Sequence, residues 1–188
     1  MYSIVLKAQS IADKLQKIMD DVCIRWKSSE NTQEYIESKP KVYVFTYDDL
    51  NGEYPLDTPS VLVQVLSIDD TGTCAFCVYC CVCNPAYQGK ETTEPVEGSN
   101  GMYKYSDDDS IDSSCVRSDL YKACLMLGER VFFALKRMSN DDESISDVIL
   151  ETPNPYMSEF PYCECTVKFN TSLSMVGSKI NTSLWDML

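Results

Sequence analysis

The 188-residue chain contains no histidine. The side chain that most often serves as a general acid or base, and as a metal ligand, is therefore missing. Basic residues are also scarce, because 16 Lys and Arg stand against 29 Asp and Glu and give a net charge of −13. Proteins that bind the phosphate backbone of nucleic acids need clustered basic residues, so this balance disfavours specific nucleic-acid binding.

Long apolar runs are lacking too, and no run approaches the roughly 18 residues of a membrane span. The N-terminal sequence MYSIVLKAQSIADKL alternates apolar and polar residues, without the continuous apolar stretch of a signal peptide. We therefore expect a chain without membrane contact in a reducing compartment. Its ten cysteines are then expected to be free thiols.

The most unusual stretch is Thr73–Cys83, TCAFCVYCCVC, which has no charged residue, proline or glycine. Its β-branched and aromatic residues, separated by small thiols, predict a strand that is covered on both faces. Val61–Ile68 also has a strand pattern, and the turn formers of Asp69–Gly72 predict an antiparallel hairpin between the two strands. We expect the cysteine-rich strand to be the central strand of a sheet.

The cysteines of this strand have the spacing of CxxC metal ligands. Side chains alternate along a strand, so Cys74 and Cys80 are expected to face one way. Cys77, Cys81 and Cys83 are expected to face the other way. No CxxC pair could then close on one ion, unlike the turn-borne pairs of zinc sites. We interpret these residues as buried core thiols.

The remaining elements follow from hydrophobic periodicity. The spacing predicts amphipathic helices at Ile4–Val22 and Leu120–Met138, and strands at Lys41–Tyr47, Val148–Glu151 and Tyr162–Asn170. This order predicts an α+β fold. Its mainly antiparallel or mixed β-sheet would carry the two amphipathic helices on one face.

Domain organisation and charge are linked. We expect a single α+β domain at 1–170 and a C-terminal tail at 171–188. A long acidic excursion at 84–115 carries seven acidic residues and two basic ones, and 139–159 carries six acidic residues and no basic one. Charge placed on connecting segments predicts solvated loops, or a surface that repels nucleic acid or binds a basic partner.

Aromatic residues are the best candidates for contacts with a partner, since loops this long are usually functional or disordered. Phe132 and Phe133 are adjacent in the second predicted helix and cannot share a face, so one of them is expected to point outward. The candidate interface residues are Tyr87, Tyr103, Tyr105, Phe133 and Trp185. The sequence offers no catalytic, cofactor-binding or metal-ligating set.

Three short sequences lie beside the predicted strands: PKVYV at Pro40–Val44, PSVLVQV at Pro59–Val65, and EFPY at Glu159–Tyr162. Together with the opening amphipathic helix and the long second helix, they resemble the tail-terminator or tail-completion proteins of long-tailed phages. The resemblance covers Ile4–Asn170 as a pattern of elements and includes no catalytic motif. The long excursion and the tail depart from the smaller members of that family.

This resemblance implies a non-enzymatic structural protein of a phage or prophage tail that forms a homo-oligomeric, hexamer-like ring. Such a ring caps the tail tube, so the implied partners are the tail tube protein and the head–tail connector protein. The implied location is the host cytoplasm during assembly and then the virion tail. An acidic ring would let DNA pass, because like charges provide no counterion-release affinity.

Two alternatives stay open. Another neck or head-closure adaptor protein would share this composition and differ in its partner. A thiol- or metal-dependent cytosolic protein would use the Cys74–Cys83 cluster, through residues such as Cys80 and Cys81. Such thiols need nearby cations to lower the pKa, and the strand contains no Lys or Arg.

Overall fold

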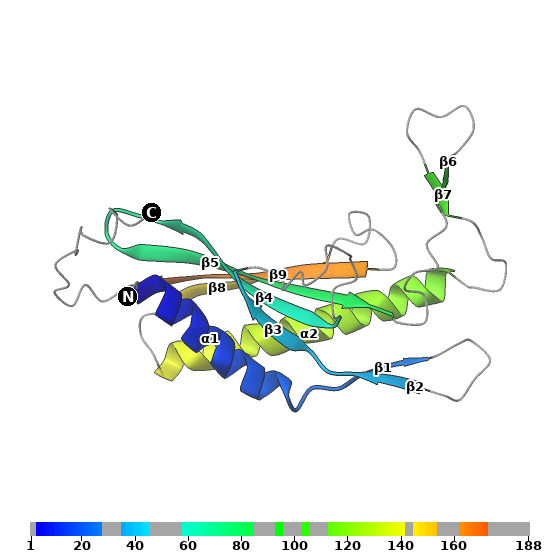
Figure 1. Ribbon diagram of the computed structural model, residues 1–188, viewed down its shortest axis with the longest axis horizontal. Coiled ribbons are helices and arrows are strands. Elements are labelled where there is room, and N and C mark those ends of the chain that lie inside the picture. The colour runs from blue at the N-terminus through cyan, green and yellow to red at the C-terminus, as the bar shows by residue number, and fades with distance from the viewer. Residues whose placement is uncertain are drawn as a thin grey trace, which may run out of the picture.

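The fold is built on a five-stranded sheet with the order β3-β4-β5-β9-β8 (Figure 1). The computed structural model describes residues 3–27, 35–45, 58–84, 93–95, 103–105, 113–141, 145–153 and 162–172. The sheet strands are β3 (Lys41–Val44), β4 (Ser60–Ile68), β5 (Thr73–Cys83), β8 (Ile145–Glu151) and β9 (Tyr162–Ser172). Strands β3 and β4 are parallel, and the other neighbouring pairs are antiparallel. The expected α+β class with a mainly antiparallel, mixed sheet is confirmed.

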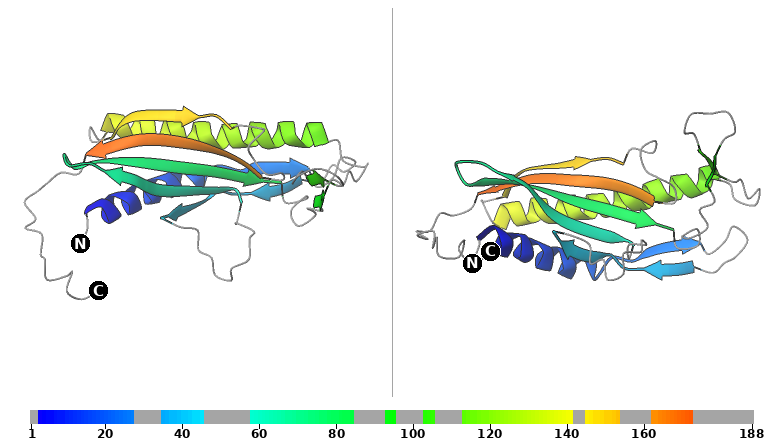
Figure 2. Two further views of the ribbon diagram at one scale, coloured as in Figure 1. Left: turned by 90° about the horizontal axis from the view of Figure 1, so that it is seen from above. Right: turned by 45° about the horizontal axis from the view of Figure 1, so that its top comes forward.

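Both helices, α1 (Ser3–Met19) and α2 (Ser113–Asp141), lie on the same side of the sheet (Figure 1). Helix α1 packs on β3 and β4, whereas α2 packs on β5, β8 and β9. The apolar stripes predicted from the sequence face the sheet, with Leu15 and Leu127 fully buried in one shared core. The opposite face of the sheet is turned to the viewer in the left panel of Figure 2. In the described part of the chain, no helix is long and apolar enough to cross a membrane.

Strand β5 is the middle strand of the sheet, as the uncharged cysteine-rich sequence predicts. Its even-numbered residues from Cys74 to Val82 belong to the core under the helices. Cys77, Cys81 and Cys83 are also buried but lie outside that core. The predicted alternation of the thiols is confirmed, and so is the central place of this strand.

A tight turn joins β4 to β5, as the sequence predicts. Oδ1 of Asp69 accepts hydrogen bonds from the backbone nitrogens of Thr71 and Thr73, at 2.9 and 2.8 Å. Gly72 has a φ of 82°, a conformation that costs glycine little. The carboxylate of Asp69 thus accepts backbone hydrogen bonds within the turn and stabilises it.

Several predicted boundaries need correction. The strand expected at Lys41–Tyr47 ends at Val44, because Phe45 adopts a φ of 66° and turns the chain out of the extended conformation. The last strand, expected to end at Asn170, continues to Ser172. The second helix begins at Ser113, inside the segment expected to be irregular.

Two short hairpins were missed. Between the first predicted helix and the first predicted strand, where no element was predicted, lie β1 (Ile24–Lys27) and β2 (Tyr35–Ser38), which pair antiparallel outside the main sheet. The excursion expected to be irregular contains β6 (Thr93–Pro95) and β7 (Tyr103–Tyr105), also paired antiparallel. Strands of three or four residues give too little periodicity to identify them from the sequence.

Candidate functional site: an apolar sheet edge and a buried thiol cluster

The structure describes the side chain of only one of the five aromatic residues predicted to contact a partner. Phe133 of α2 has 65% of its surface exposed, while Phe132 beside it packs against the core. The two rings meet edge to face at 5.3 Å, so the expectation that one of them points outward is confirmed. Tyr103 and Tyr105 lie in β7, where the structure describes the backbone alone. Tyr87 and Trp185 lie outside the described residues.

The second half of β4 forms an open edge of the sheet. Strand β3 covers only its first half, where the amide of Phe45 still donates to the carbonyl oxygen of Val63 at 2.9 Å. Nε2 of Gln64 then donates to the carbonyl oxygen of Phe45 at 3.1 Å and closes this pairing. Among the described residues, Val65–Ile68 has β5 as its only neighbouring strand. Its outer backbone groups therefore face away from the sheet.

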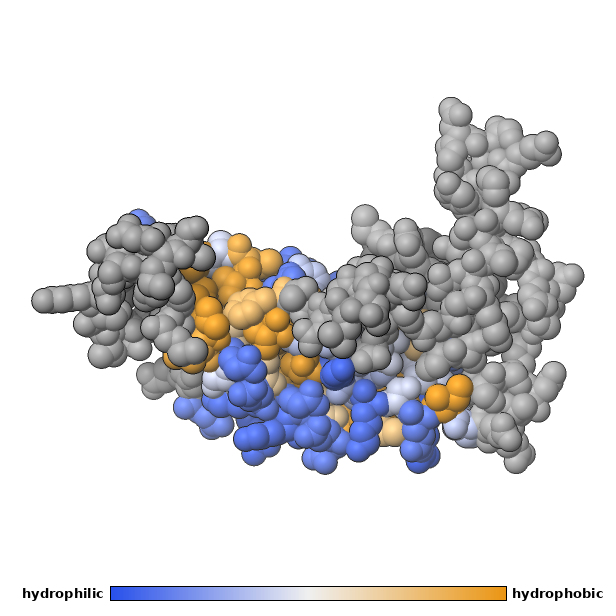
Figure 3. Space-filling model, in the orientation of Figure 1, coloured by the Kyte–Doolittle hydropathy of each residue, from blue (hydrophilic) through white to orange (hydrophobic). Residues whose placement is uncertain are grey.

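Exposed apolar side chains lie on this edge and on elements that pack beside β4. Leu66 and Ile68 of β4 are 49% and 54% exposed. The exposed apolar residues on α1 and at the end of β3 are Val5, Leu6, Ile18 and Phe45. Figure 3 shows polar residues along the lower margin of this view and apolar residues gathered above them. We call Phe45, Leu66 and Ile68, together with Val5 and Leu6 of α1, the apolar edge. An exposed apolar edge of a sheet is typical of an interaction site.

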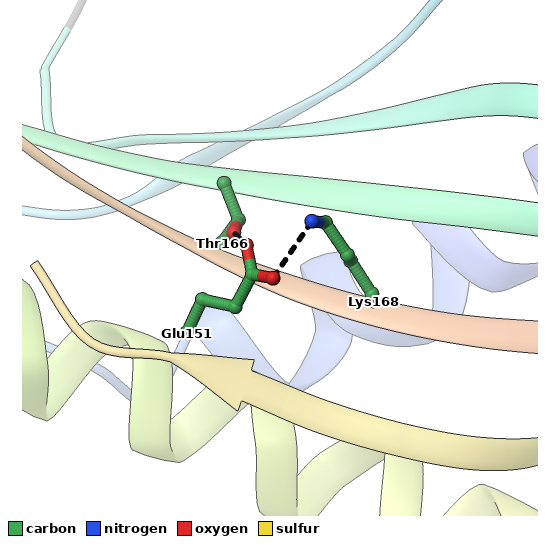
Figure 4. A network of polar contacts seen from close by, with 3 residues as sticks. All are labelled: Glu151, Thr166 and Lys168. Carbon is green, nitrogen blue, oxygen red and sulfur yellow. Dashed lines mark hydrogen bonds and ion pairs between the residues drawn. The ribbon is translucent and has the colours of Figure 1, made fainter.

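The opposite edge of the sheet is protected. At β8 the pairing with β9 shifts register between Ser146 and Ile149, and Asp147 between them has a φ of 52°. Nζ of Lys168 lies 2.7 Å from Oε1 of Glu151, and Thr166 donates to Oε2 of the same carboxylate at 2.8 Å (Figure 4). Charged side chains and a bulge are devices by which edge strands avoid pairing with other chains. Strand β4 also has a register shift, between Val65 and Ser67, so the charged side chains are what distinguishes the β8 edge.

The Glu151 network also shifts two pKa values. The hydrogen bond from Lys168, followed by that from Thr166, lowers the pKa of Glu151. The same contact with Glu151 raises the pKa of Lys168. The ion pair thus holds β8 to β9 on the face of the sheet that lies away from the helices.

Four buried cysteines converge between α2 and the sheet. Cys80 of β5 and Cys165 of β9 are directly opposite each other in the antiparallel pairing. Cys124 of α2 lies over them, its Sγ 3.7 Å from the carbonyl oxygen of Cys80, and Sγ of Cys165 lies 3.4 Å from the carbonyl oxygen of Cys124. Cys163 contacts the Cys124 thiol. We call Cys80, Cys124, Cys163 and Cys165 the thiol cluster.

Helix α2 comes unusually close to the thiol cluster at Gly128. A Cβ atom at this position would lie 2.5 Å from Sγ of Cys165 and 3.1 Å from Cδ1 of Leu150. Only glycine lets the helix backbone approach the sulfur this closely. The glycine therefore fixes the distance between α2 and β9.

The thiols differ in acidity. Contact with the Cys165 thiol and burial raise the pKa of Cys80, and contacts with Cys163 and Cys165 raise that of Cys124. Hydrogen bonds from the Cys124 and Cys80 thiols lower the pKa of Cys165, because they favour its thiolate.

Cys77 and Cys81, on the other face of the sheet, are less acidic than free thiols. Burial, followed by the nearby charge of Glu164, raises the pKa of Cys81 to about 12. Burial also raises the pKa of Cys77. These shifts disfavour a nucleophilic role for Cys81, which the thiol-enzyme alternative requires.

The sequence analysis did not predict that the four thiols of the cluster lie together. The signals are present in the sequence, since Cys163 and Cys165 alternate with polar residues in the last strand and Cys124 falls on the apolar period of the second helix. Their convergence depends on the strand order and on which strands α2 covers, and no local pattern determines either of these. Among the described residues, no group of three or more Cys, Asp or Glu side chains is arranged to hold a metal ion.

Comparison with known proteins adds no relative to these observations. The chain matches no protein-family description and no curated protein sequence.

Proposed function

We propose that the chain is a non-enzymatic structural protein of a phage or prophage tail. In this proposal, copies of it form a ring that caps the tail tube and joins it to the head connector. The observation that carries the proposal is the apolar edge, where Leu66 and Ile68 are exposed on the half of β4 that has a neighbouring strand on one side only among the described residues. Exposed edge strands with apolar side chains favour pairing with another chain.

A second exposed position supports a ring in particular. A ring built by rotation needs two different complementary surfaces on each subunit, because contacts run head to tail. The apolar edge lies on β4 and α1, whereas Phe133 is exposed on α2. Helix α1 packs on β3 and β4, whereas α2 packs on β5, β8 and β9, so the two surfaces lie on different parts of the subunit. One subunit thus offers two separate contacts.

Charge fits the same role. With a net charge of −13, a ring of this chain would carry strong negative potential. DNA passing through such a ring would gain no affinity from counterion release. The proposal therefore includes weak or no binding to duplex DNA at physiological salt, which a filter-binding or anisotropy titration measures.

The decisive experiment is native mass spectrometry of the purified protein, alone and with isolated tail tubes, combined with negative-stain electron microscopy. We expect a closed ring in solution or at the tube end. Leu66→Lys places a charge in the apolar edge, and Phe133→Lys places one on α2, so each variant is expected to abolish the ring.

Ile149→Lys is the matched control, because Ile149 is 57% exposed on β8 but lies in neither surface. It is expected to assemble like the wild type. A chain that stays monomeric at high concentration, both alone and with tail tubes, contradicts the proposal. Closed rings that bind head connectors but no tail tube would favour the neck-adaptor alternative.

A further inference from the structure

The thiol cluster has a chemistry that the proposed structural role does not use. Buried cysteines ordinarily act as small apolar residues. Here Cys80 and Cys165 are opposite each other across an antiparallel strand pair, and their thiols are in contact. Opposite residues in such a pair have Cα atoms about 4.5–5.5 Å apart, which falls inside the range that a disulfide spans. Direct strand partners of this kind are therefore close enough for a disulfide.

We propose that Cys80 and Cys165 form a reversible cross-strand disulfide when the protein meets a hydroperoxide. This inference rests on the thiol geometry alone and does not depend on the ring. The disulfide would join β5 to β9 at the centre of the sheet. The chain between the two cysteines includes all of α2 and β8.

The chemistry has two steps. The Cys165 sulfur attacks one oxygen of the hydroperoxide, the O–O bond breaks, and the leaving oxygen takes up the proton that Cys165 has released. Cys165 is now a sulfenic acid. The Cys80 sulfur displaces its hydroxide, the S–S bond forms, and the Cys80 proton leaves with the hydroxide as water. Two thiols and one hydroperoxide give one disulfide, one alcohol and one water.

Cys165 is the thiol suited to react first. Its contacts with two neighbouring thiols favour the thiolate, which is the reactive form. Cys124 and Cys163 lie beside the pair, so a sulfenic acid at Cys165 has several thiols close by and is expected to be trapped before further oxidation.

Peptide mapping tests the inference. The reduced, folded protein is treated with hydrogen peroxide, unfolded in an alkylating reagent, digested and analysed by mass spectrometry. We expect a peptide pair linked through Cys80 and Cys165, which a dithiol reductant converts back to free thiols. Cys165→Ser is expected to abolish this link, whereas Cys77→Ser, a buried thiol of the same strand outside the cluster, is expected to leave it unchanged.

The wild-type map decides the question even if Cys165→Ser does not fold, which circular dichroism shows. Sulfinic acid at Cys165 without a link overturns the inference, and so does oxidation confined to the exposed Cys23, including dimers linked through it, with no Cys80–Cys165 link. The same treatment of the unfolded protein is the second control. An equal yield of the Cys80–Cys165 link there would show that the fold does not direct it, and would overturn the inference as well.

Discussion

Phe76 of β5 and Phe169 of β9 stack face to face across the strand pair, with ring centroids 5.1 Å apart and planes inclined by 11°. They are direct partners in the register, and both are fully buried under the helices. Of the described side chains that are fully buried, these two are the largest. The stacked pair therefore stabilises the pairing of β5 with β9.

Truncating this pair is expected to be costly. Phe169→Ala should lower the free energy of unfolding by about 3–5 kcal/mol, because it removes buried area and leaves a cavity. Phe169→Leu keeps most of the volume and should cost less, although it also loses about 0.5–1.5 kcal/mol from the ring pair. Urea unfolding followed by circular dichroism measures both. Phe133→Ala, at an exposed position, is the control and should change stability by no more than about 0.5 kcal/mol.

Gly128→Ala is expected to destabilise the protein although alanine favours helices. The new Cβ would lie 2.5 Å from Sγ of Cys165, so α2 must move away from β9. Overpacking of this kind costs about 1–3 kcal/mol, against about 1 kcal/mol gained in helix propensity. Unfolding of Gly128→Ala, Cys165→Ala and the double variant gives the coupling energy. If the double variant lost as much free energy of unfolding as the two single variants together, the proposed clash would be contradicted.

The ion pair of Glu151 with Lys168 predicts a pH dependence of stability. The folded pKa of Glu151 is lowered, so its contribution is present above the unfolded pKa and is lost as the pH falls through the folded pKa. Wild type should therefore be more stable than Glu151→Gln at pH 7, and the difference should shrink as the pH falls below about 4.3. Thermal unfolding at a series of pH values measures it. The pair is half exposed, so the effect is small and should weaken further in high salt.

The turn between β4 and β5 depends on one carboxylate. Oδ1 of Asp69 accepts from the backbone of Thr71 and Thr73 and from the Thr71 hydroxyl. Asp69→Asn keeps an acceptor oxygen, whereas Asp69→Ala leaves those donors to water. We expect both variants to lower the melting temperature, the alanine variant by more. Equal melting temperatures for the two variants would mean that the turn does not need the side-chain acceptor.

Native-state alkylation should separate the thiols. Cys23 is exposed and is expected to react at the rate of an ordinary surface thiol. Cys81 is buried and its pKa is raised to about 12, so it should react many times more slowly. Mass spectrometry of partly labelled protein identifies the order. Fast labelling of Cys81 would instead favour the thiol-dependent alternative.

Strong local patterns are enough to predict part of this structure. The period of 3.6 in both helices and the uncharged run of β5 each require burial on a defined face, so they determine an element and its orientation. The turn at Asp69–Gly72 has residues that favour it directly, and the hairpin follows. For the same reason the alternation of Cys74 and Cys80 against Cys77 follows from the geometry of a single strand.

The sequence by itself determined that β5 is buried on both faces and that its CxxC spacing cannot close on one ion, because strand geometry is local. Only the tertiary structure decided which thiols meet. Cys80 contacts Cys165 because β9 pairs with β5 in one register, and Cys124 joins them because α2 crosses those strands at Gly128. The open edge of β4 likewise arises from the early end of β3 at Phe45. Such contacts depend on strand order and packing between segments far apart in the chain, which no local pattern encodes.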